Sequence, residues 1–251
     1  MTSSVENLIP LKEKRPAKLL SRDSNTKLIK TAKNQPVVLA GLSMMPTPEL
    51  CPSSKIAQCF DDCLKHSGLA QVYRSINDAR QCKTDYFLQQ TDEFISHLNR
   101  ELTNLSAYAA KHSKRAVVRL NVLSDVAWEN YGVIQNFPDI LFYDYTKRAA
   151  RLGKTPSNYH LMFSYSGAPK YQTQVNMALK TDVPITVVFK NGLPSKFLGR
   201  DVIDGDKSDL DNLKARNKIV GLRVKGNEAK RSDSPFIVDS QTCPVPLLLA
   251  A

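Results

Sequence analysis

The sequence predicts an α/β protein with a mostly parallel sheet, either doubly wound or curved into an open partial barrel, with flanking helices. Three observations support this fold class. Short apolar segments alternate with helical periodicity in the later part of the chain, as in strands joined by crossover helices. Hydrophobic residues make up 42% of the 251 residues, which is enough for a sizeable core. Charged residues make up 24%, an ordinary fraction for a globular protein.

The chain begins with a polar, basic segment at residues 1–34. This segment holds eight lysine and arginine residues, and Pro10 and Pro16 interrupt it. Such a composition predicts a flexible basic arm. Residues 35–240 are predicted to form a single domain, and the apolar segment 36–42 is expected to be its first buried strand.

The segment 51–112 contains most of the cysteines and is predicted to be mainly helical. A proline-rich loop comes first, after which Ser53 or Ser54 can cap a helix that runs to about His66. A longer helix is predicted over 71–111, where apolar side chains recur at helical spacing and are expected to lie in the core. These side chains are Phe87, Phe94, Ile95, Leu98, Leu102 and Leu105.

Strands and helices are expected to alternate in the remainder of the domain. The predicted strands are 116–121, 139–143, 159–164, 184–189 and 219–224. The predicted helices are 127–135, 144–152, 171–180 and 206–216. The apolar, proline-broken tail at 241–251 is expected to dock on the core or on a neighbouring subunit of a homo-oligomer.

The net charge of +11 and the pI near 9.4 point to a polyanionic partner. No apolar segment approaches the roughly 18 residues of a membrane span, and the first residues lack the apolar segment of a signal peptide. We therefore expect a cytoplasmic protein, without a membrane partner, that binds single-stranded DNA or another nucleic acid. The alternative is a basic surface that serves only solubility.

The chain has five cysteines, and an odd number in a chain expected to be cytosolic argues against a disulfide framework. Cys59 and Cys63 are one helical turn apart, and Cys51 lies in the loop before them. Together with His66 they form a candidate metal site for zinc or an iron–sulfur cluster. Cys82 is another candidate for the fourth ligand. The alternative is that these cysteines are reduced, partly buried core residues.

Aromatic and basic side chains are interleaved between residues 142 and 171, which is typical of surfaces that bind single strands by stacking and phosphate contacts. A second basic segment follows near residue 223. The candidate nucleic-acid-binding residues are Arg119, Asn121, Tyr143, Tyr145, Lys147, Arg148, Arg151, Tyr159, His160, Lys170, Arg223 and Lys225. Phe142 is expected to be a core residue.

An enzyme remains the competing hypothesis. In that case the cysteines would hold an iron–sulfur cluster with one open coordination position, and four polar residues would line the site. These residues are Asp125, Asp144, Lys147 and His160. The two aspartates are equally well explained as helix caps. Asp201, Asp204, Asp206 and Asp209 could bind a divalent cation, although Asp-Gly-Asp is typical of a turn. The sequence lacks Walker A, GxGxxG and HExxH patterns.

The order of several motifs resembles a family of phage proteins labelled gene-product-88-like. The matching blocks are Cys51–Pro52 with Cys59 and Cys63, Ala79–Arg80 with Lys83–Thr84, Arg119–Asn121 with Ser124–Asp125 and Trp128, Phe142–Lys147 (FYDYTK), Asn158–His160 with Phe163–Ser164, Val202–Asp206, and Val220–Leu222 with Lys225–Gly226. The resemblance covers about residues 35–240. The chain departs from it after the third cysteine, where Ser67–Ala70 replaces an Ala-Gly-Arg-Gly turn.

The resemblance implies a phage origin and two kinds of activity. Similar proteins resemble early single-stranded-DNA-binding proteins of podoviruses, which help a phage RNA polymerase at promoters. The cysteine loop before an α/β repeat also looks like that of an iron–sulfur radical enzyme. The charge favours the first hypothesis, and we expect a nucleic-acid-binding protein that supports phage transcription or replication.

Overall fold

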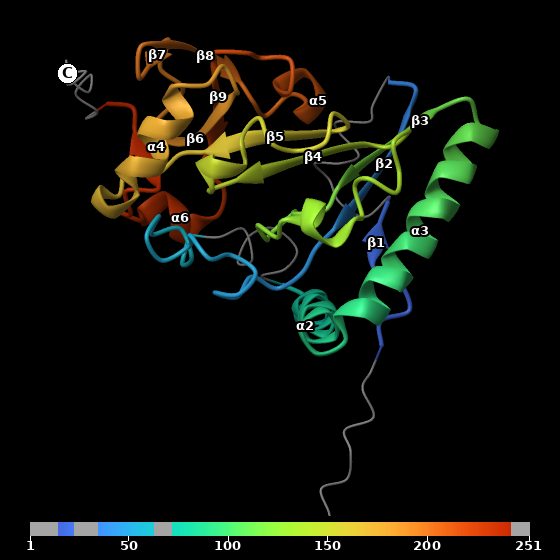
Figure 1. The fold of residues 1–251 in the computed structure, drawn as a ribbon. Coiled ribbons are helices and arrows are strands. Elements are labelled where there is room, and N and C mark those ends of the chain that lie inside the picture. Colours follow the sequence, from blue (N-terminus) through green and yellow to red (C-terminus); the bar gives the residue numbers. More distant parts are fainter. Residues whose placement is uncertain (1–14, 23–34, 63–71, 242–251) are drawn as a thin grey trace, which may run out of the picture.

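The computed structural model describes residues 15–22, 35–62 and 72–241 (Figure 1). The strands are β1 Leu20–Ser21, β2 Val37–Leu42, β3 Arg115–Arg119, β4 Leu141–Thr146, β5 Tyr159–Ser164, β6 Ile185–Lys190, β7 Lys196–Phe197, β8 Arg200–Asp204, β9 Ile219–Arg223 and β10 Ile237–Asp239. The α-helices are α2 Arg74–Gln89, α3 Thr91–Lys111, α4 Gln172–Leu179, α5 Asp209–Asn212 and α6 Asn227–Arg231. The 3-10 helices are η3 Trp128–Tyr131, η4 Ala149–Arg151 and η5 Pro169–Tyr171.

The strands form one mostly parallel sheet, which confirms the predicted fold class. Their order is β1-β2-β3-β4-β5-β6-β9-β8-β7, and β10 pairs with β6. Only the edge pairs β1–β2 and β7–β8 are antiparallel among the described strands. The described strands do not close into a barrel, because β1 and β7 lie at opposite ends of this order. None of the helices in the described ranges is long and apolar enough to cross a membrane.

Strand β6 has two partners on the same side, and this arrangement shapes the site. Its first half pairs with β5, where Ser164 lies opposite Thr186. Its second half pairs with β10, where Ile237 lies opposite Val188. The chain after β5 therefore leaves the sheet partway along β6, and β10 takes its place.

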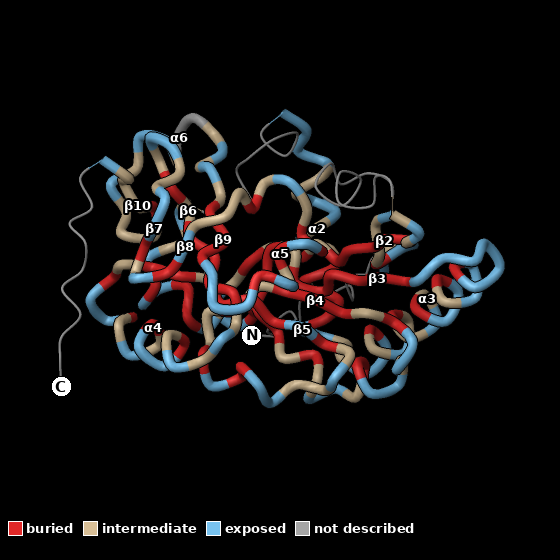
Figure 2. The backbone as a smooth tube through the Cα atoms, turned by 90° about the horizontal axis from the view of Figure 1, so that it is seen from above, coloured by how far each residue is buried: buried red, intermediate tan, exposed pale blue. Residues whose placement is uncertain are grey.

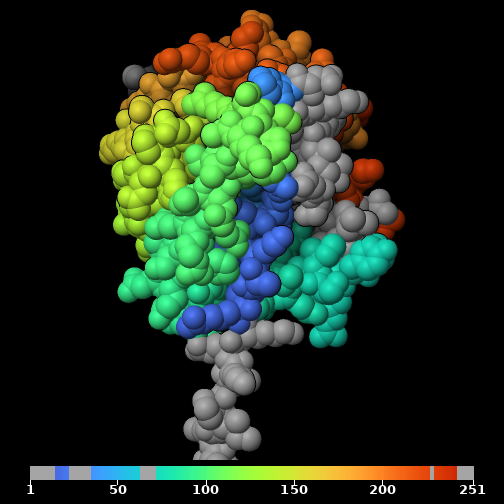
Figure 3. Space-filling model, turned by 90° about the vertical axis from the view of Figure 1, so that its right-hand side faces the viewer, coloured from blue at the N-terminus to red at the C-terminus, as the bar shows by residue number. Residues whose placement is uncertain are grey.

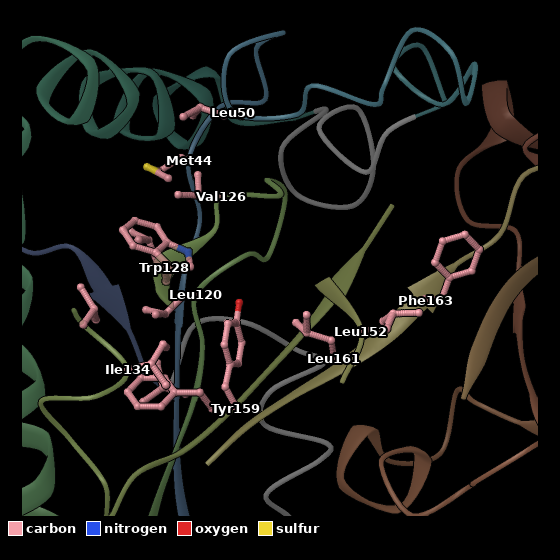
Figure 4. Close-up of a cluster of buried hydrophobic side chains, with 14 of the residues drawn as sticks. Met44, Leu50, Leu120, Val126, Trp128, Ile134, Leu152, Tyr159, Leu161 and Phe163 are labelled. Atoms are coloured by element: carbon pink, nitrogen blue, oxygen red, sulfur yellow. The ribbon is translucent and has the colours of Figure 1, made fainter. Parts of the chain in front are cut away.

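The sheet has two differently covered faces. The outer face packs on α2, α3 and α4 and forms the larger core, in which Trp128 and Tyr159 are buried (Figure 4). The inner face carries a smaller cluster in which Leu210 of α5 packs with Tyr143 and Met162. Figure 2 shows the buried strands surrounded by more exposed loops and helices. Because β4 and β5 are covered on both sides, they are apolar at most positions.

The structure corrects several predicted helices. The helix predicted from Ser53 or Ser54 to His66 is a series of turns over its described residues, where Gln58 has a left-handed φ of 50° that interrupts helical geometry. The helix predicted at 71–111 is divided at Gln90, whose backbone angles (φ −138°, ψ 60°) are not helical. This break lets Phe87 of α2 meet Phe94 of α3 edge to face, with ring centroids 5.1 Å apart.

The helices predicted after the next strands are shorter than expected. The predicted helices 127–135 and 144–152 contain only the 3-10 helices η3 and η4. The second prediction was wrong at its start because β4 continues to Thr146. The predicted helix 206–216 contains only the four residues of α5. Strands β1, β7 and β10 and helix α6 were not predicted, since they are too short to show periodicity. Strand β8 was not predicted because its charged residues, in the sequence RDVID, leave no apolar segment.

Part of the predicted basic arm is ordered against the domain. In residues 15–22, β1 pairs with β2, and the Leu19 side chain is fully buried. The backbone N–H groups of Leu19 and Leu20 donate to the Glu101 carboxylate of α3 at 2.7 and 2.8 Å. Figure 3 shows this segment lying along α3. The rest of the arm, as well as the tail from residue 242 onward, lies outside the described residues.

Candidate functional site

A cleft opens on the inner face at the carboxyl ends of the parallel strands. The loops after β2, β3 and β4, together with β6 and the ends of β5 and β9, supply its walls. Its charged residues, among those described, are Asp62, Arg119, Asp125, Lys147, Arg223 and Lys225. Parallel α/β proteins collect functional residues at this edge, because the loops there converge and can vary without disturbing the sheet. The cleft is therefore the candidate functional site.

Residues 43–62, here called the cysteine loop, run across the cleft. The loop is attached on one side by the Asp125 N–H, which donates to the Leu50 carbonyl at 2.8 Å. It is attached on the other side by the Ser166 hydroxyl, which donates to the Ala57 carbonyl at 2.7 Å. Asp125 follows β3 and Ser166 follows β5, so the loop passes over the strand ends between them. It covers part of the cleft.

Two of the predicted metal ligands line this cleft. Cys51 and Cys59 are both half-buried, and the turn between them is closed by the Cys59 N–H, which donates to the Ser54 carbonyl at 3.2 Å. Burial raises the pKa of the Cys59 thiol, and the nearby Lys147 ammonium opposes that rise. Cys63 and His66 lie outside the described residues. Within the described ranges, no three metal-ligating side chains gather in one place.

Asn121 organises the loop after β3 through its buried carboxamide. Its Oδ1 accepts hydrogen bonds from the Ser124 hydroxyl at 2.8 Å, the Val126 N–H at 2.9 Å and the Trp128 indole at 3.1 Å. Its Nδ2 donates to the Val126 carbonyl at 2.9 Å and to Asp144 at 3.3 Å. This one side chain therefore joins the polar residues of the RLN…SD…W block, and its role in this structure is to fix the cleft wall.

Asp125 joins that wall to the FYDYTK segment. Its carboxylate accepts from the Thr146 hydroxyl at 2.8 Å, the Lys147 N–H at 3.0 Å and the Arg151 guanidinium at 2.8 Å. Arg151 in turn binds both carboxylate oxygens of Glu129 at 2.8 Å. Burial raises the pKa of Asp125, while the guanidinium groups of Arg148 and Arg151 oppose this rise. Asp125 lines the cleft, but its oxygens are already engaged by these donors.

Asp144 lies behind the cleft wall and is fully buried. It accepts hydrogen bonds from the Asn121 N–H at 2.7 Å and from the Tyr159 hydroxyl at 2.8 Å. Burial raises its pKa to about 7, and Arg119 and the Tyr159 hydrogen bond oppose the rise. Because Asp144 does not line the cleft, its position supports the loop that Asn121 organises.

Arg119 connects the cleft to helix α5. Its guanidinium lies over the Tyr145 ring at 4.5 Å and forms an ion pair with Asp209 at 3.6 Å. The hydroxyls of Tyr143 and Tyr145 donate to the same Asp209 carboxylate at 3.1 and 2.9 Å. Burial raises the pKa of both tyrosines well above the ordinary value. This buried network holds the N-terminus of α5 against the inner face, with Arg119 at its cleft end.

Lys147 places an ammonium group inside the cleft. Its Nζ donates to the Ser164 hydroxyl at 3.0 Å and lies within 3.4 Å of the Ser164 and Tyr165 carbonyl oxygens. The ammonium also lies 4.4 Å from the centre of the Phe236 ring, a distance typical of a cation–π contact. Lys147 and the two cysteines are thus brought to one cleft from segments far apart in the sequence.

The other candidate nucleic-acid-binding residues do not form one surface. Tyr143 and Tyr159 are buried in the protein, so neither ring offers a face for base stacking in this structure. Arg151 is also buried, and Arg148 donates to the Asp125 carbonyl. His160 and Lys170 are exposed and do not line the cleft.

Arg223 and Lys225 lie at the cleft edge beside the aspartates of the β8–β9 region. Arg223 contacts Asp204 at 2.9 Å and Asp206 at 3.3 Å, and Lys225 contacts Asp206 at 3.0 Å. These contacts lower the pKa of Asp204, chiefly through the Arg223 hydrogen bond. The aspartates proposed as cation ligands therefore interact with basic side chains here.

Sequence analysis did not identify Ser164, Thr186, Glu129 or Phe236 as site residues. Thr186 carried the clearest signal, since it is a polar residue within the apolar segment ITVVF of β6. That signal does not reveal that Thr186 stands opposite Ser164, because the pairing of β5 with β6 is a tertiary contact. Asp209 was considered as a cation ligand, but the structure places it in the Arg119 network.

The family model described as gene product 88 matches residues 18–240 of the chain. This match confirms the family that the motif blocks indicated. No curated protein matches the chain, and no solved structure matches it.

Proposed function

With the chain placed in the gene product 88 family of phage proteins, to which it belongs, we propose that it is a metal-dependent enzyme whose substrate binds in the cleft beneath the cysteine loop. The observation that carries this proposal is the position of Cys51 and Cys59. Both line a cleft at the carboxyl ends of parallel strands, together with Lys147 and Arg119. In α/β proteins this edge is where catalytic residues gather.

The donor set suits an iron–sulfur cluster. Thiolates are the ligands that such clusters use, and Cys63, which follows Cys59 in the sequence after three residues, would supply the third thiol. Three protein thiolates leave one coordination position for a substrate or cofactor, whereas a structural zinc site is closed by four protein ligands. When bound, the cluster would supply electron transfer at the mouth of the cleft. Metal binding would also deprotonate Cys59, whose thiol pKa burial raises.

The surrounding residues have separate tasks in this proposal. Lys147 brings an ammonium group to the cleft and attracts an anionic substrate group, whereas Arg119 is paired with Asp209 and orders the wall. Asn121 and Asp125 are positioning residues, since they hold the wall and the backbone of Lys147 through buried hydrogen bonds. The cysteine loop limits the access of water, which strengthens the electrostatic interactions beneath it.

The test is metal and sulfide analysis of the full chain, with an absorption spectrum, after anaerobic purification. We expect a coloured protein with iron and acid-labile sulfide, and loss of both in Cys51→Ala, Cys59→Ala and Cys63→Ala. Cys82→Ala is the matched control, because this half-buried cysteine lies on α2 and does not line the cleft. A colourless, iron-free wild type, or iron that survives all three substitutions, would contradict the proposal.

A second proposed function is the binding of single-stranded nucleic acid, and the net charge of +11 supports it. The exposed residues of the predicted set are His160, Lys170, Arg223 and Lys225. Binding through phosphates predicts that the affinity for an oligonucleotide falls steeply as the salt concentration rises. A fluorescence anisotropy titration at several salt concentrations measures this slope. Weak binding whose affinity does not change with salt concentration would contradict this second proposal.

A further inference from the structure

Three hydrogen-bond donors stand together on the floor of the cleft. Lys147 directly follows β4, Ser164 ends β5 and Thr186 lies in β6. The Lys147 ammonium is 3.0 Å from the Ser164 hydroxyl, and Ser164 pairs in register with Thr186. Residues paired across neighbouring strands point to the same face of a sheet, and both line the cleft. The three donors therefore converge on one part of the inner face.

Thr186 carries the observation that points to a ligand. Its side chain is 4% exposed, and its hydroxyl has no hydrogen-bond partner among the residues that the structure describes. The neighbouring Ile185 and Val187 point into the outer core, so Thr186 points the other way, into the cleft. A buried hydroxyl without a partner is unfavourable, and valine would fit a strand at this position without that cost. The hydroxyl is explained if a bound group accepts its hydrogen bond.

The charge of the cleft indicates the sign of that group. Four basic and two acidic side chains are among its described lining residues. Most of these charges are paired, Asp125 with Arg151 at 2.8 Å, Arg119 with Asp209 at 3.6 Å, and Arg223 and Lys225 with Asp204 and Asp206. The sign of the ligand is therefore argued from Lys147, whose ammonium lies 3.0 Å from the Ser164 hydroxyl, beside Thr186. An ammonium and two hydroxyls are suited to an oxyanion, because all three can donate hydrogen bonds to its negatively charged oxygens.

We propose that Lys147, Ser164 and Thr186 form a subsite for the carboxylate or phosphate group of a small organic anion. Apolar side chains continue the same wall, with Val188 next along β6 and Leu222 and Phe236 nearby in the lining, so the ligand also has an apolar part. The assignment of this anion as the substrate rests on the proposed enzyme function. Binding of the anion itself does not depend on the metal.

The experiment is a ligand-observed NMR titration of the full chain with two probes, inorganic phosphate and butyrate, followed by competition between them. We expect the wild type to bind at least one of the two probes. If both bind, each should displace the other, because they would occupy the same subsite. Lys147→Met should weaken binding by about tenfold or more, and Thr186→Val by several-fold. Thr186→Val removes only an unpaired hydroxyl, so it is expected to fold.

Lys190→Met is the matched control. Lys190 ends β6, contacts Asp233 at 3.4 Å and does not line the cleft, so its loss should leave probe binding unchanged. The proposal is overturned if the wild type binds neither probe, or if Thr186→Val and Lys147→Met bind as the wild type does. Iron analysis of the same samples separates the anion subsite from the proposed enzyme function. A colourless protein that still binds a probe would support the subsite and contradict the iron–sulfur enzyme.

Discussion

At the scale of single residues, Asn121 and Asp144 show how buried polar groups shape the cleft. Asn121 accepts three hydrogen bonds from its own loop, and Asp144 accepts its backbone N–H at 2.7 Å. Buried polar networks specify one conformation when their members are satisfied. The loop after β3, and with it the position of Asp125 in the cleft, therefore depends on a carboxylate that lies outside the cleft.

Asp144 also predicts a pH dependence of stability. Its pKa is about 7 in the folded protein, against roughly 3.9 for an unfolded chain. Between these two pH values the Asp144 carboxyl is protonated in the folded state and ionised in the unfolded state. The free energy of unfolding therefore falls as pH rises. Asp144→Asn cannot ionise. The unfolding free energy of the wild type relative to this variant should therefore fall by up to about 1.4 kcal/mol per pH unit from about pH 4 to 7.

Urea denaturation at a series of pH values measures this difference, because ionisations common to both proteins cancel. The exposed Asp139→Asn serves as the control and should show no such trend. A difference between wild type and Asp144→Asn that stays constant over this pH range would contradict the raised pKa.

At the scale of elements, hydrogen bonds from segments distant in the sequence hold the cysteine loop across the cleft. The Ser166 hydroxyl donates to the Ala57 carbonyl, and the Ser234 hydroxyl donates to the Gln58 carbonyl at 2.6 Å. Ser166 follows β5, and Ser234 precedes β10. The position of the loop is therefore determined by the sheet. This explains how turns without regular secondary structure can present two thiols to one cleft.

Ser166→Ala is expected to loosen the cysteine loop without unfolding the sheet. The Ala57 carbonyl loses its donor, so local opening of the loop becomes less costly. Hydrogen–deuterium exchange should become faster in residues 50–59 and stay unchanged in β3 to β6. Ser96→Ala, an exposed position on α3, is the control. Unchanged exchange in the loop would show that this hydrogen bond does not hold it.

At the scale of the whole molecule, residues 15–22 complete the edge of the sheet. β1 covers β2, Leu19 is fully buried, and the Lys83 ammonium donates to the Leu19 carbonyl at 2.7 Å. Burial lowers the pKa of Lys83, and Glu101 opposes that shift. The segment therefore satisfies polar groups of both α2 and α3 and belongs to the folded domain.

Removal of residues 1–22 should lower the free energy of unfolding by at least about 2 kcal/mol. The loss of Leu19 exposes apolar surface, and Glu101 and Lys83 lose buried partners. Chemical denaturation compares this variant with one that lacks residues 1–14 only, so that the difference between the two reports on residues 15–22. Equal denaturation midpoints for both truncations would show that the segment adds no stability.

The sequence by itself determined the mostly parallel α/β class, the positions of the main strands along the chain, and the family. Those features follow from local periodicity and motif order, and the apolar segments of β3 to β6 carry both signals. It also identified Cys51, Cys59 and Lys147 as candidate site residues. Helix lengths were overestimated where backbone breaks such as Gln90 depend on packing.

Only the tertiary structure decided which polar residues face the cleft and which are buried. Tyr143 lies in β4 and Lys147 directly follows that strand. Tyr143 nevertheless hydrogen-bonds Asp209 of α5, whereas Lys147 lines the cleft. Thr186 became a candidate site residue only because the register of β5 against β6 places it opposite Ser164. The physical reason is that burial and pairing depend on residues distant in the chain, whereas a sequence pattern records only the preferences of neighbouring residues.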